Sequence, residues 1–424
     1  MASGVATTVI NTVVMVVAYP IYLHFLGYEK YGVWLVLATV LSFAQLGNLG
    51  IGQAVMKLVA EDYGRNDIKG IQRYVTTALT MLSVSGIIVL SVILAFKTQI
   101  VAVFKLSDEN AEMAAWLLPY IGVLSIYVFI VRALNSTLSG LGRMDLANYV
   151  QSLGRVVAVG FAATLLYSGQ GIESLLIGNT LSYLFIHILS LICIRRIGHI
   201  RLLRIDNLDI QRGKRILRFG GAVFGGSLIG MLLSPFNKLM LSRYAGVSSI
   251  PVYEIAFRGS RQIRGLFEVG LRALMPEISR IGTNMTRNAK DRISQIYRRA
   301  MRFIFLFGTV VCGGMIISIA PLLKFWLGPR FVDELPIAFR IMLTSAFLSL
   351  LSVPSYYTLQ GLGMVRYTLI SHIILSGISA VIILTIILVG HDISVEKVCC
   401  ATLSATTISA LYLRWNNKQK VLKG

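Results

Sequence analysis

Apolar runs of membrane length recur along the whole chain and restrict its fold more than any other feature. Examples are Val5–Leu23, Ala78–Phe96 and Phe303–Leu323. Each is about 20 residues long, the length of α-helix that crosses a hydrocarbon core ~30 Å thick. With 55% hydrophobic and 14% charged residues, the chain is also too apolar for an ordinary soluble domain. The sequence therefore predicts an all-α integral membrane protein.

About twelve transmembrane helices are expected. Their approximate ranges are 5–24, 34–55, 75–96, 113–141, 146–168, 173–194, 219–242, 250–276, 303–323, 334–362, 367–390 and 394–413. Of the 40 Lys and Arg residues, 25 follow the even-numbered spans or lie in the C-terminal tail, and 7 follow the odd-numbered spans. This asymmetry predicts that both termini are cytoplasmic, and it explains the net charge of +21 without a nucleic-acid partner.

The second half of the chain repeats the first at an offset of about 221 residues. Leu138–Gly142 recurs as Leu359–Gly363, and further matches are Tyr31 with Tyr253, Gly50 with Gly270, Tyr74 with Tyr297 and Gly154 with Gly377. The offset covers six spans, so both halves keep the same orientation and form a parallel repeat. The expected parts are a six-helix bundle over 1–196, a basic cytoplasmic linker over 197–217 and a second bundle over 218–424. In such repeats the substrate path runs between the bundles, which rock against each other.

The eighth expected span has charged side chains on one face. They are Glu254, Arg258, Arg261, Arg264, Glu268 and Arg272. At 100° per residue they share a stripe of roughly 120°. An Arg at the membrane centre costs ~3 kcal/mol on the insertion scale, so this face cannot point at lipid. We interpret the stripe as the lining of a polar cavity. The alternatives are an amphipathic helix on the membrane surface and a structural Arg–Glu ladder. The repeat disfavours the surface helix, because it aligns this span with the second.

Other spans offer weaker polar faces that would line the same cavity. These additional candidates are Gln45 and Asn48 in the second span, Arg132 and Asn135 in the fourth, Asn148, Gln151 and Arg155 in the fifth, and Lys238 in the seventh. Each set is equally consistent with hydrogen bonds between helices. An interior dominated by Arg should attract an anion, and guanidinium groups match phosphate through bidentate hydrogen bonds. The sequence therefore favours an anionic substrate, such as one with a diphosphate head group.

Four segments carry a resemblance to a known family: Leu26–Trp34, Leu46–Gly52, the Leu-x-Gly-Leu-Gly pair and Phe325–Gly328. They resemble oligosaccharide flippases of the polysaccharide-transporter family, within the multidrug/oligosaccharidyl-lipid/polysaccharide exporter superfamily. The resemblance implies two six-helix bundles in a V around a central cavity, and alternating access. It also implies export of polyprenyl-diphosphate-linked sugar, such as O-antigen of lipopolysaccharide or capsule repeat units, across a bacterial cytoplasmic membrane. Implied partners are membrane lipids, a coupling ion (H⁺ or Na⁺), and glycosyltransferases or polysaccharide polymerases.

Two other functions compete with this interpretation. A multidrug antiporter of the same superfamily should have acidic cavity residues for cationic drugs, whereas this chain has arginines. A membrane glycosyltransferase or polymerase needs catalytic acids outside the membrane, but the longest outer connection, about Lys97–Glu112, offers only Asp108, Glu109 and Glu112. There is no Walker motif, and the four cysteines lack metal-ligand spacing. We therefore expect a transporter without catalytic residues, cofactor or metal.

Overall fold

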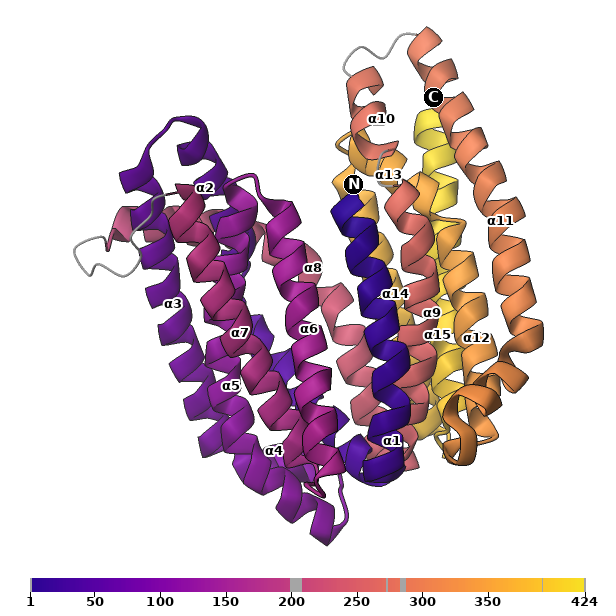
Figure 1. Cartoon of the computed structure of the whole chain (residues 1–424). Helices are drawn as coiled ribbons and strands as arrows, with labels where there is room; N and C mark the ends of the chain where they lie inside the picture. Colours follow the sequence, from indigo (N-terminus) through magenta and orange to yellow (C-terminus); the bar gives the residue numbers. More distant parts are fainter. Residues whose placement is uncertain (1, 199–207, 272–273, 283–286, 391, 423–424) are drawn as a thin grey trace. The chain divides into compact units, whose positions relative to one another are not determined.

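The computed structural model describes residues 2–198, 208–271, 274–282, 287–390 and 392–422 (Figure 1). These residues form helices and turns and contain no β-strand. In chain order the elements are α1 (Ala2–Ala44), η1 (Gln45–Asn48), α2 (Ile51–Gly64), α3 (Ile68–Ala95), α4 (Lys97–Val103), α5 (Asp108–Gly140), α6 (Met144–Tyr167), α7 (Glu173–Gly198), α8 (Ile210–Ala245), α9 (Ser249–Leu271), α10 (Leu274–Gly282), α11 (Arg287–Leu327), η3 (Gly328–Arg330), α12 (Glu334–Leu350), α13 (Val353–Gly361), α14 (Val365–Leu388), α15 (Val395–Asn417) and η4 (Lys418–Leu422).

Eight helical segments among the described residues are long and apolar enough to cross a membrane. One of them, Ala6–Asn48, covers the first expected span from residue 6 and the second as far as residue 48, because α1 bends at Gly27 (φ 67°, ψ −179°). Glycine adopts this positive φ without a Cβ clash. The expected spans at 219–242 and 394–413 coincide with α8 and α15, and the span at 250–276 coincides with α9 as far as Leu271; these three helices are more polar than the eight segments. The protein is thus an all-α, multi-pass membrane protein, as the sequence predicts.

The contacts within the chain divide it into two compact units, Met1–Leu228 and Ile229–Gly424, called here the N-terminal and C-terminal units. The boundary lies inside α8, so this helix begins in one unit and ends in the other. The functional division into 1–196, 197–217 and 218–424 stays a prediction. Residues 199–207 of the predicted linker lie outside the described residues.

The Leu-x-Gly-Leu-Gly motif adopts the same turn in both units. Its last glycine has a positive φ in each copy, +78° at Gly142 and +74° at Gly363. The residue after that glycine donates its N–H to the carbonyl of the leucine that begins the motif, at 3.1 Å in the first copy and 2.8 Å in the second. The motif therefore ends α5 and α13 with the same backbone hydrogen bonds.

The middle glycine of the motif also packs in the same way in both units. A Cβ at Gly140 would lie 2.7 Å from the carbonyl oxygen of Met56 on α2, and a Cβ at Gly361 would lie 2.8 Å from that of Met275 on α10. Both glycines thus permit a backbone approach that no larger residue allows. The sequence repeat extends to the packing of equivalent helices.

The second expected span, 34–55, is not one continuous helix. It is interrupted by η1 and by two residues with positive φ, Leu49 (47°) and Gly50 (71°). Ser85 on α3 donates its hydroxyl to the carbonyl of Gly47 at 2.6 Å, which satisfies one backbone group of the break. A Cβ at Gly50 would clash with the carbonyl of Gly220 on α8. The interruption lets the backbone at Leu49 and Gly50 meet that of α8 directly.

The start of α8 is fixed to α2 and α3 by Arg212. Its Nη1 donates to Asp62 Oδ2 at 2.8 Å and to the Gly70 carbonyl at 3.0 Å, and its guanidinium lies 4.3 Å from the ring centroid of Tyr74. Asp209 lies 3.4 Å from its Nε. Burial alone would lower the pKa of Arg212, but the hydrogen bond and charge of Asp62 hold it above its usual value. A permanently charged clamp thus joins three helices of the N-terminal unit.

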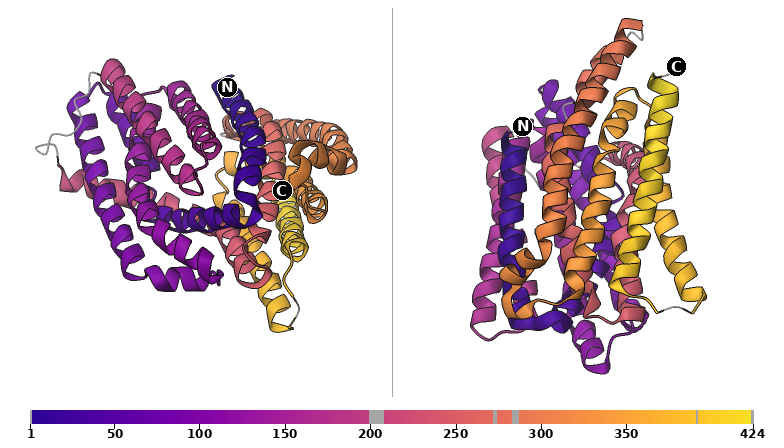
Figure 2. Two further views of the ribbon diagram at one scale, coloured as in Figure 1. Left: turned by 60° about the horizontal axis from the view of Figure 1, so that its bottom comes forward. Right: turned by 90° about the vertical axis from the view of Figure 1, so that its right-hand side faces the viewer.

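In the C-terminal unit, α11 is longer than a membrane is thick. Its 41 residues give about 60 Å of helix, against ~30 Å of hydrocarbon core. Phe305, Leu306 and Ile317 on it are exposed, as expected of a surface that contacts lipid. Figure 2 shows α11 extending past α12 and α14, at the end of the unit where the C-terminus lies. The first turns of α11, with exposed Arg298 and Arg299, therefore project beyond the apolar part of the unit.

Candidate functional site

The charged stripe predicted from the sequence lies on α9, which packs against α12 and α15 within the C-terminal unit. α8 ends in a turn at Gly246 (φ +87°), and the Ser249 hydroxyl donates to the Gly246 carbonyl at 2.6 Å where α9 begins. This short turn makes α8 and α9 neighbours in space as well as in sequence. As a result, polar residues late in α8 face polar residues early in α9.

Glu254 is the only stripe residue among those described that is fully enclosed, with its side chain 1% exposed. Its Oε2 lies 2.8 Å from Nζ of Lys238 on α8, whose side chain is 7% exposed, and its other oxygen forms an ion pair with Arg258 one turn along α9. A buried carboxylate is tolerated only when it is paired. Two cations on one carboxylate leave this cluster with a net positive charge.

A hydrogen-bonded layer lies beside this cluster. Asn237 donates from Nδ2 to the Tyr253 hydroxyl at 3.0 Å and to Thr402 Oγ1 on α15 at 3.1 Å. Asn237 and Tyr253 are fully buried, and the Tyr253 ring stacks on Phe257 with 5.4 Å between centroids. These bonds tie α8, α9 and α15 together around the ion pairs. They fix the position from which Arg258 extends outward, with 57% of its side chain exposed.

The remaining stripe residues lie toward the surface of the unit. Arg261 is exposed, and its guanidinium lies 5.3 Å from the ring centroid of Phe257. Arg264 is half-buried and donates from Nε to Glu268 Oε1 at 2.7 Å. Arg272 lies outside the described residues. Arg258 and Arg261 are thus exposed and Arg264 is partly exposed, and Arg258 and Arg264 are each paired with an acid of the same helix.

The candidates in the N-terminal unit lie on three elements. Arg132 and Asn135 are half-buried on α5; Asn148 and Gln151 are half-buried and Arg155 is exposed on α6; Gln45 and Asn48 are half-buried on η1. Asn48 lies near Ser136 of α5. A Cβ added at Gly52 would lie 3.0 Å from Ser136 Oγ and 3.8 Å from Asn48 Nδ2. The amide oxygens of Asn48 and Asn135 are buried, and neither accepts a hydrogen bond from a described residue. Such buried acceptors call for a water or a ligand.

Sequence reasoning named Lys238 and Glu254 separately but missed that they pair. It also missed Tyr253 and Thr402 as parts of the same polar layer. A signal was present for one of them, since Tyr253 directly precedes Glu254 and matches Tyr31 of the repeat. The sequence contains no comparable signal for Thr402, because threonine is common in apolar helices.

A family model described as "polysaccharide biosynthesis protein" matches residues 2–282, about two thirds of the chain. The chain belongs to this family. No curated protein sequence matches it significantly. Its family membership therefore rests on the match to the family model.

Solved structures with the same fold are transporters of the MOP superfamily. An inward-facing multidrug resistance MATE transporter matches with a TM-score of 0.80 and 16% identity, over 98% of this chain and 95% of its own. The lipid II flippase MurJ, in an inward closed conformation, matches with a TM-score of 0.74 and 15% identity, over 97% and 87%. A transporter from Pyrococcus furiosus, described as having a binding pocket of reverse polarity, matches with a TM-score of 0.66 and 16% identity, over 100% and 95%. This member of the polysaccharide biosynthesis family thus has the MOP transporter fold.

Proposed function

We propose that the protein is a flippase that moves a polyprenyl-diphosphate-linked oligosaccharide across a bacterial cytoplasmic membrane by alternating access. Its substrate class would be a surface-polysaccharide repeat unit, such as O-antigen or capsule. It would act without catalytic residues, and glycosyltransferases or a polysaccharide polymerase would work before and after it. Coupling to H⁺ or Na⁺ would provide the driving force.

Three arginines on one face of α9 carry this proposal. Arg258, Arg261 and Arg264 lie on one face of a helix whose opposite side packs into the C-terminal unit. Planar guanidinium groups bind phosphate oxygens in pairs, and a diphosphate offers several such oxygens within a short distance. The buried Glu254 holds Arg258 in position through their ion pair. A fixed row of cations suits a diphosphate better than a cationic or neutral substrate.

Polar groups in the N-terminal unit support the same function. Arg132 and Arg155 add cations on α5 and α6, and the amide oxygens of Asn48 and Asn135 accept no hydrogen bond from a described residue. Amide groups beside arginines suit a ligand that combines phosphates with sugar hydroxyls, since hydroxyls both donate and accept. Arg132, Arg155, Asn148 and Gln151 would therefore be suited to contact phosphate and sugar groups of the substrate.

The second candidate function is multidrug transport. The likeness to a multidrug resistance MATE transporter, with a TM-score of 0.80, favours it. The side chains favour the flippase, because every candidate cavity acid in the described residues is already paired. Glu254 is shared by Lys238 and Arg258, and Glu268 is bound by Arg264. A cationic drug would have to displace these arginines to reach a carboxylate.

The orientation belongs to the same proposal. Both termini would lie in the cytoplasm, because the segments on that side hold 25 of the 40 Lys and Arg residues. The α5–α6 and α13–α14 turns, α10 and the start of α11 would then face the cytoplasm. Diphosphate-linked sugar would enter from this side, where positive charge is concentrated.

Flipping by purified protein in proteoliposomes tests the proposal. A lipid-linked oligosaccharide is placed in the vesicles, and its arrival in the opposite leaflet is followed with an external glycosidase. Replacing Arg258, Arg261 or Arg264 with Ala should lower the rate about tenfold or more, because each change removes charge-assisted hydrogen bonds to phosphate. Arg261→Lys should retain part of the activity, since charge remains but bidentate geometry is lost.

Arg340→Ala is the matched control. Arg340 is an exposed arginine on α12 whose Nε donates to the Ile316 carbonyl at 3.1 Å, so its loss removes one cation of the same unit outside the stripe. The flipping rate of Arg340→Ala should equal that of the wild type. Unchanged rates in all three α9 variants would remove the stripe from the mechanism. Transport of a cationic dye, with no flipping of the lipid-linked sugar, would favour the multidrug alternative.

A further inference from the structure

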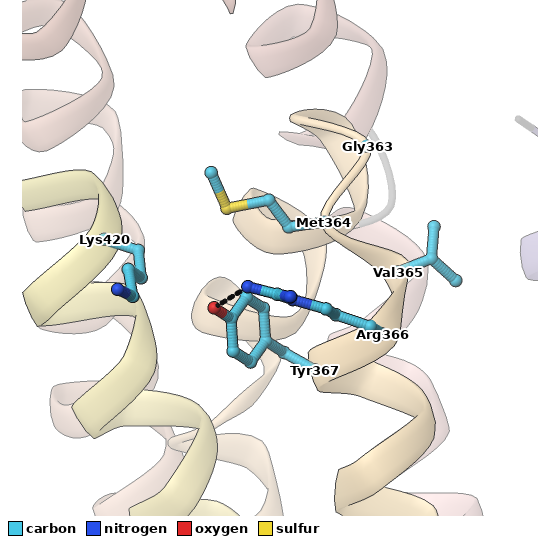
Figure 3. Close-up of a pocket in the computed structure, with 6 residues that line it drawn as sticks. All are labelled: Gly363, Met364, Val365, Arg366, Tyr367 and Lys420. Atoms are coloured by element: carbon cyan, nitrogen blue, oxygen red, sulfur yellow. Dashed lines mark hydrogen bonds between the residues drawn. The ribbon is translucent and has the colours of Figure 1, made fainter.

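A pocket of about 400 Å³ lies in the C-terminal unit, and no residue of the α9 stripe lines it (Figure 3). It is lined by Gly363, Met364, Val365, Arg366, Tyr367 and Lys420. The first five form the turn from α13 into α14, and Lys420 comes from η4 after α15. We call it the α14–η4 pocket. It lies at the end of the unit where α10, the start of α11 and the C-terminus gather (Figure 1).

The charged side chains of the pocket are both cations. Arg366 donates from Nη2 to the Tyr367 hydroxyl at 2.7 Å, and its guanidinium lies 4.7 Å from the centroid of that ring. Figure 3 shows Lys420 on the facing helix, across the pocket from this guanidinium. Neither cation forms an ion pair with a described acid, and no acidic residue lines the pocket. The pocket therefore concentrates uncompensated positive charge.

Two further features of the pocket suit an anion attached to a lipid. The α14 helix is 24 residues long and begins at the pocket, and its N-cap residue Met364 makes no side-chain cap hydrogen bond. The Tyr367 N–H donates to the Met364 carbonyl at 3.3 Å, so the N–H groups of Val365 and Arg366 are the ones in the first turn that an anion could reach. The floor beneath the cations is apolar, since Tyr367 packs in a buried cluster with Leu413 and Val421. In such a pocket the cations could contact the phosphate of a lipid headgroup, and the apolar residues beneath them could contact the start of its acyl chain.

The equivalent turn of the N-terminal unit lacks this character. There Arg143 binds Asp145 in a bidentate pair, with 3.0 Å from Nε to Oδ1 and 2.9 Å from Nη2 to Oδ2. The repeat places Met364 at the position of Arg143 and Arg366 at that of Asp145. The charges of the turn thus cancel in the N-terminal unit, whereas the equivalent turn of the C-terminal unit carries a net positive charge. This difference between the repeats indicates a role that only the C-terminal copy has.

We propose that the α14–η4 pocket binds a lipid-borne phosphate group, with Arg366 and Lys420 as its ligands. Two lipids carry this chemistry: an anionic phospholipid of the cytoplasmic leaflet, and the polyprenyl diphosphate of a transport substrate. In the first case the pocket holds a structural or regulatory lipid. In the second it is an entry site for substrate. The pocket itself does not depend on the proposed function, because phospholipid binding requires no transport.

Native mass spectrometry of the purified full-length protein tests this proposal. The protein is titrated separately with phosphatidylglycerol, with a polyprenyl diphosphate and with inorganic phosphate. Arg366→Ala and Lys420→Ala should each weaken binding of the bound lipid about tenfold, as expected for the loss of a charge-assisted contact. The double variant Met364→Arg/Arg366→Asp installs the N-terminal sequence in the same turn, and it should weaken lipid binding at least as much.

Arg298→Ala is the control, because it removes one exposed cation from α11 at the same end of the unit but outside the pocket. It should change lipid affinity less than twofold. Melting temperatures close to that of the wild type show that the variants are folded. Tighter binding of phosphatidylglycerol supports a phospholipid site, and tighter binding of polyprenyl diphosphate supports an entry site. Equal losses in Arg298→Ala and Arg366→Ala, or binding of inorganic phosphate as tight as that of both lipids, would overturn the proposal.

Discussion

Lys238 and Glu254 form an ion pair inside the C-terminal unit, with 2.8 Å between Nζ and Oε2 and both side chains no more than 7% exposed. Glu254 is also paired with Arg258, whereas Lys238 has Glu254 as its only ion-pair partner among the described residues. The two members of the pair are therefore not equivalent. Removal of the carboxylate leaves the buried Lys238 without its counter-charge, while removal of the lysine leaves the carboxylate paired with Arg258.

This asymmetry predicts a graded loss of stability. Glu254→Gln should destabilise the protein by about 3–5 kcal/mol, the range for breaking a buried pair, because Lys238 stays buried without a counter-charge. Lys238→Met should cost less, since Arg258 still pairs with Glu254. The double variant should recover part of the loss of Glu254→Gln. Thermal unfolding in detergent measures the order, and equal melting temperatures for both single variants would contradict it.

The Arg212 clamp predicts that lysine cannot replace this arginine. Arg212 reaches Asp62 and the Gly70 carbonyl from one nitrogen and lies over the Tyr74 ring. A lysine would keep the charge but lose the planar group that permits these contacts together. Arg212→Lys should therefore lower the melting temperature nearly as much as Arg212→Ala. Arg215→Lys is the comparison. Arg215 is more exposed and pairs with Glu61 at 2.7 Å, so this change should have little effect. Wild-type stability of Arg212→Lys would refute the clamp.

The glycines of the repeated motif predict a paired effect of substitution. Gly140→Ala and Gly361→Ala should each destabilise their unit by ~1–3 kcal/mol, since the added Cβ would meet the backbone carbonyl of Met56 or Met275. Gly160→Ala on α6 and Gly377→Ala on α14 are controls, because a Cβ at either site meets no atom within 4 Å. These two should be neutral or stabilising. Melting temperatures of the four variants test the prediction, and a drop in Gly377→Ala matching that in Gly361→Ala would contradict it.

The membrane spans and the repeat could be predicted because each rests on a local property of the sequence. Run length gives helices that match the hydrocarbon core, and the Leu-x-Gly-Leu-Gly copies mark the same turn in both units, confirmed by the φ angles of Gly142 and Gly363. The break at Leu49 and Gly50 was not predicted, although Gly47, Asn48 and Gly50 are residue types that weaken a helix, because such residues alone do not show whether a span is interrupted. It depends instead on the contact with Gly220, which is far away in sequence.

The candidate site shows the same limit. The period of a helix placed Glu254, Arg258, Arg261 and Arg264 on one face of α9, and the structure has the described arginines there. Burial of Glu254 against Lys238 depends on how α8 and α9 are rotated about their axes, which no single-helix pattern contains. A position-by-position comparison of the repeats does indicate the cationic character of the α14–η4 pocket, since Arg366 occupies the position of Asp145.

The pairing along α9 has a consequence for how quickly a bound anion could leave. Arg258 and Arg264 each already share a carboxylate of their own helix, while Arg261 has none among the described residues. An incoming phosphate would exchange places with Glu254 or Glu268 at two arginines and add a full new contact at only one. Under the proposed function, this exchange of partners would keep the free energies of binding and release nearly balanced. A carrier gains speed from that balance, because a ligand held too firmly would stop its cycle.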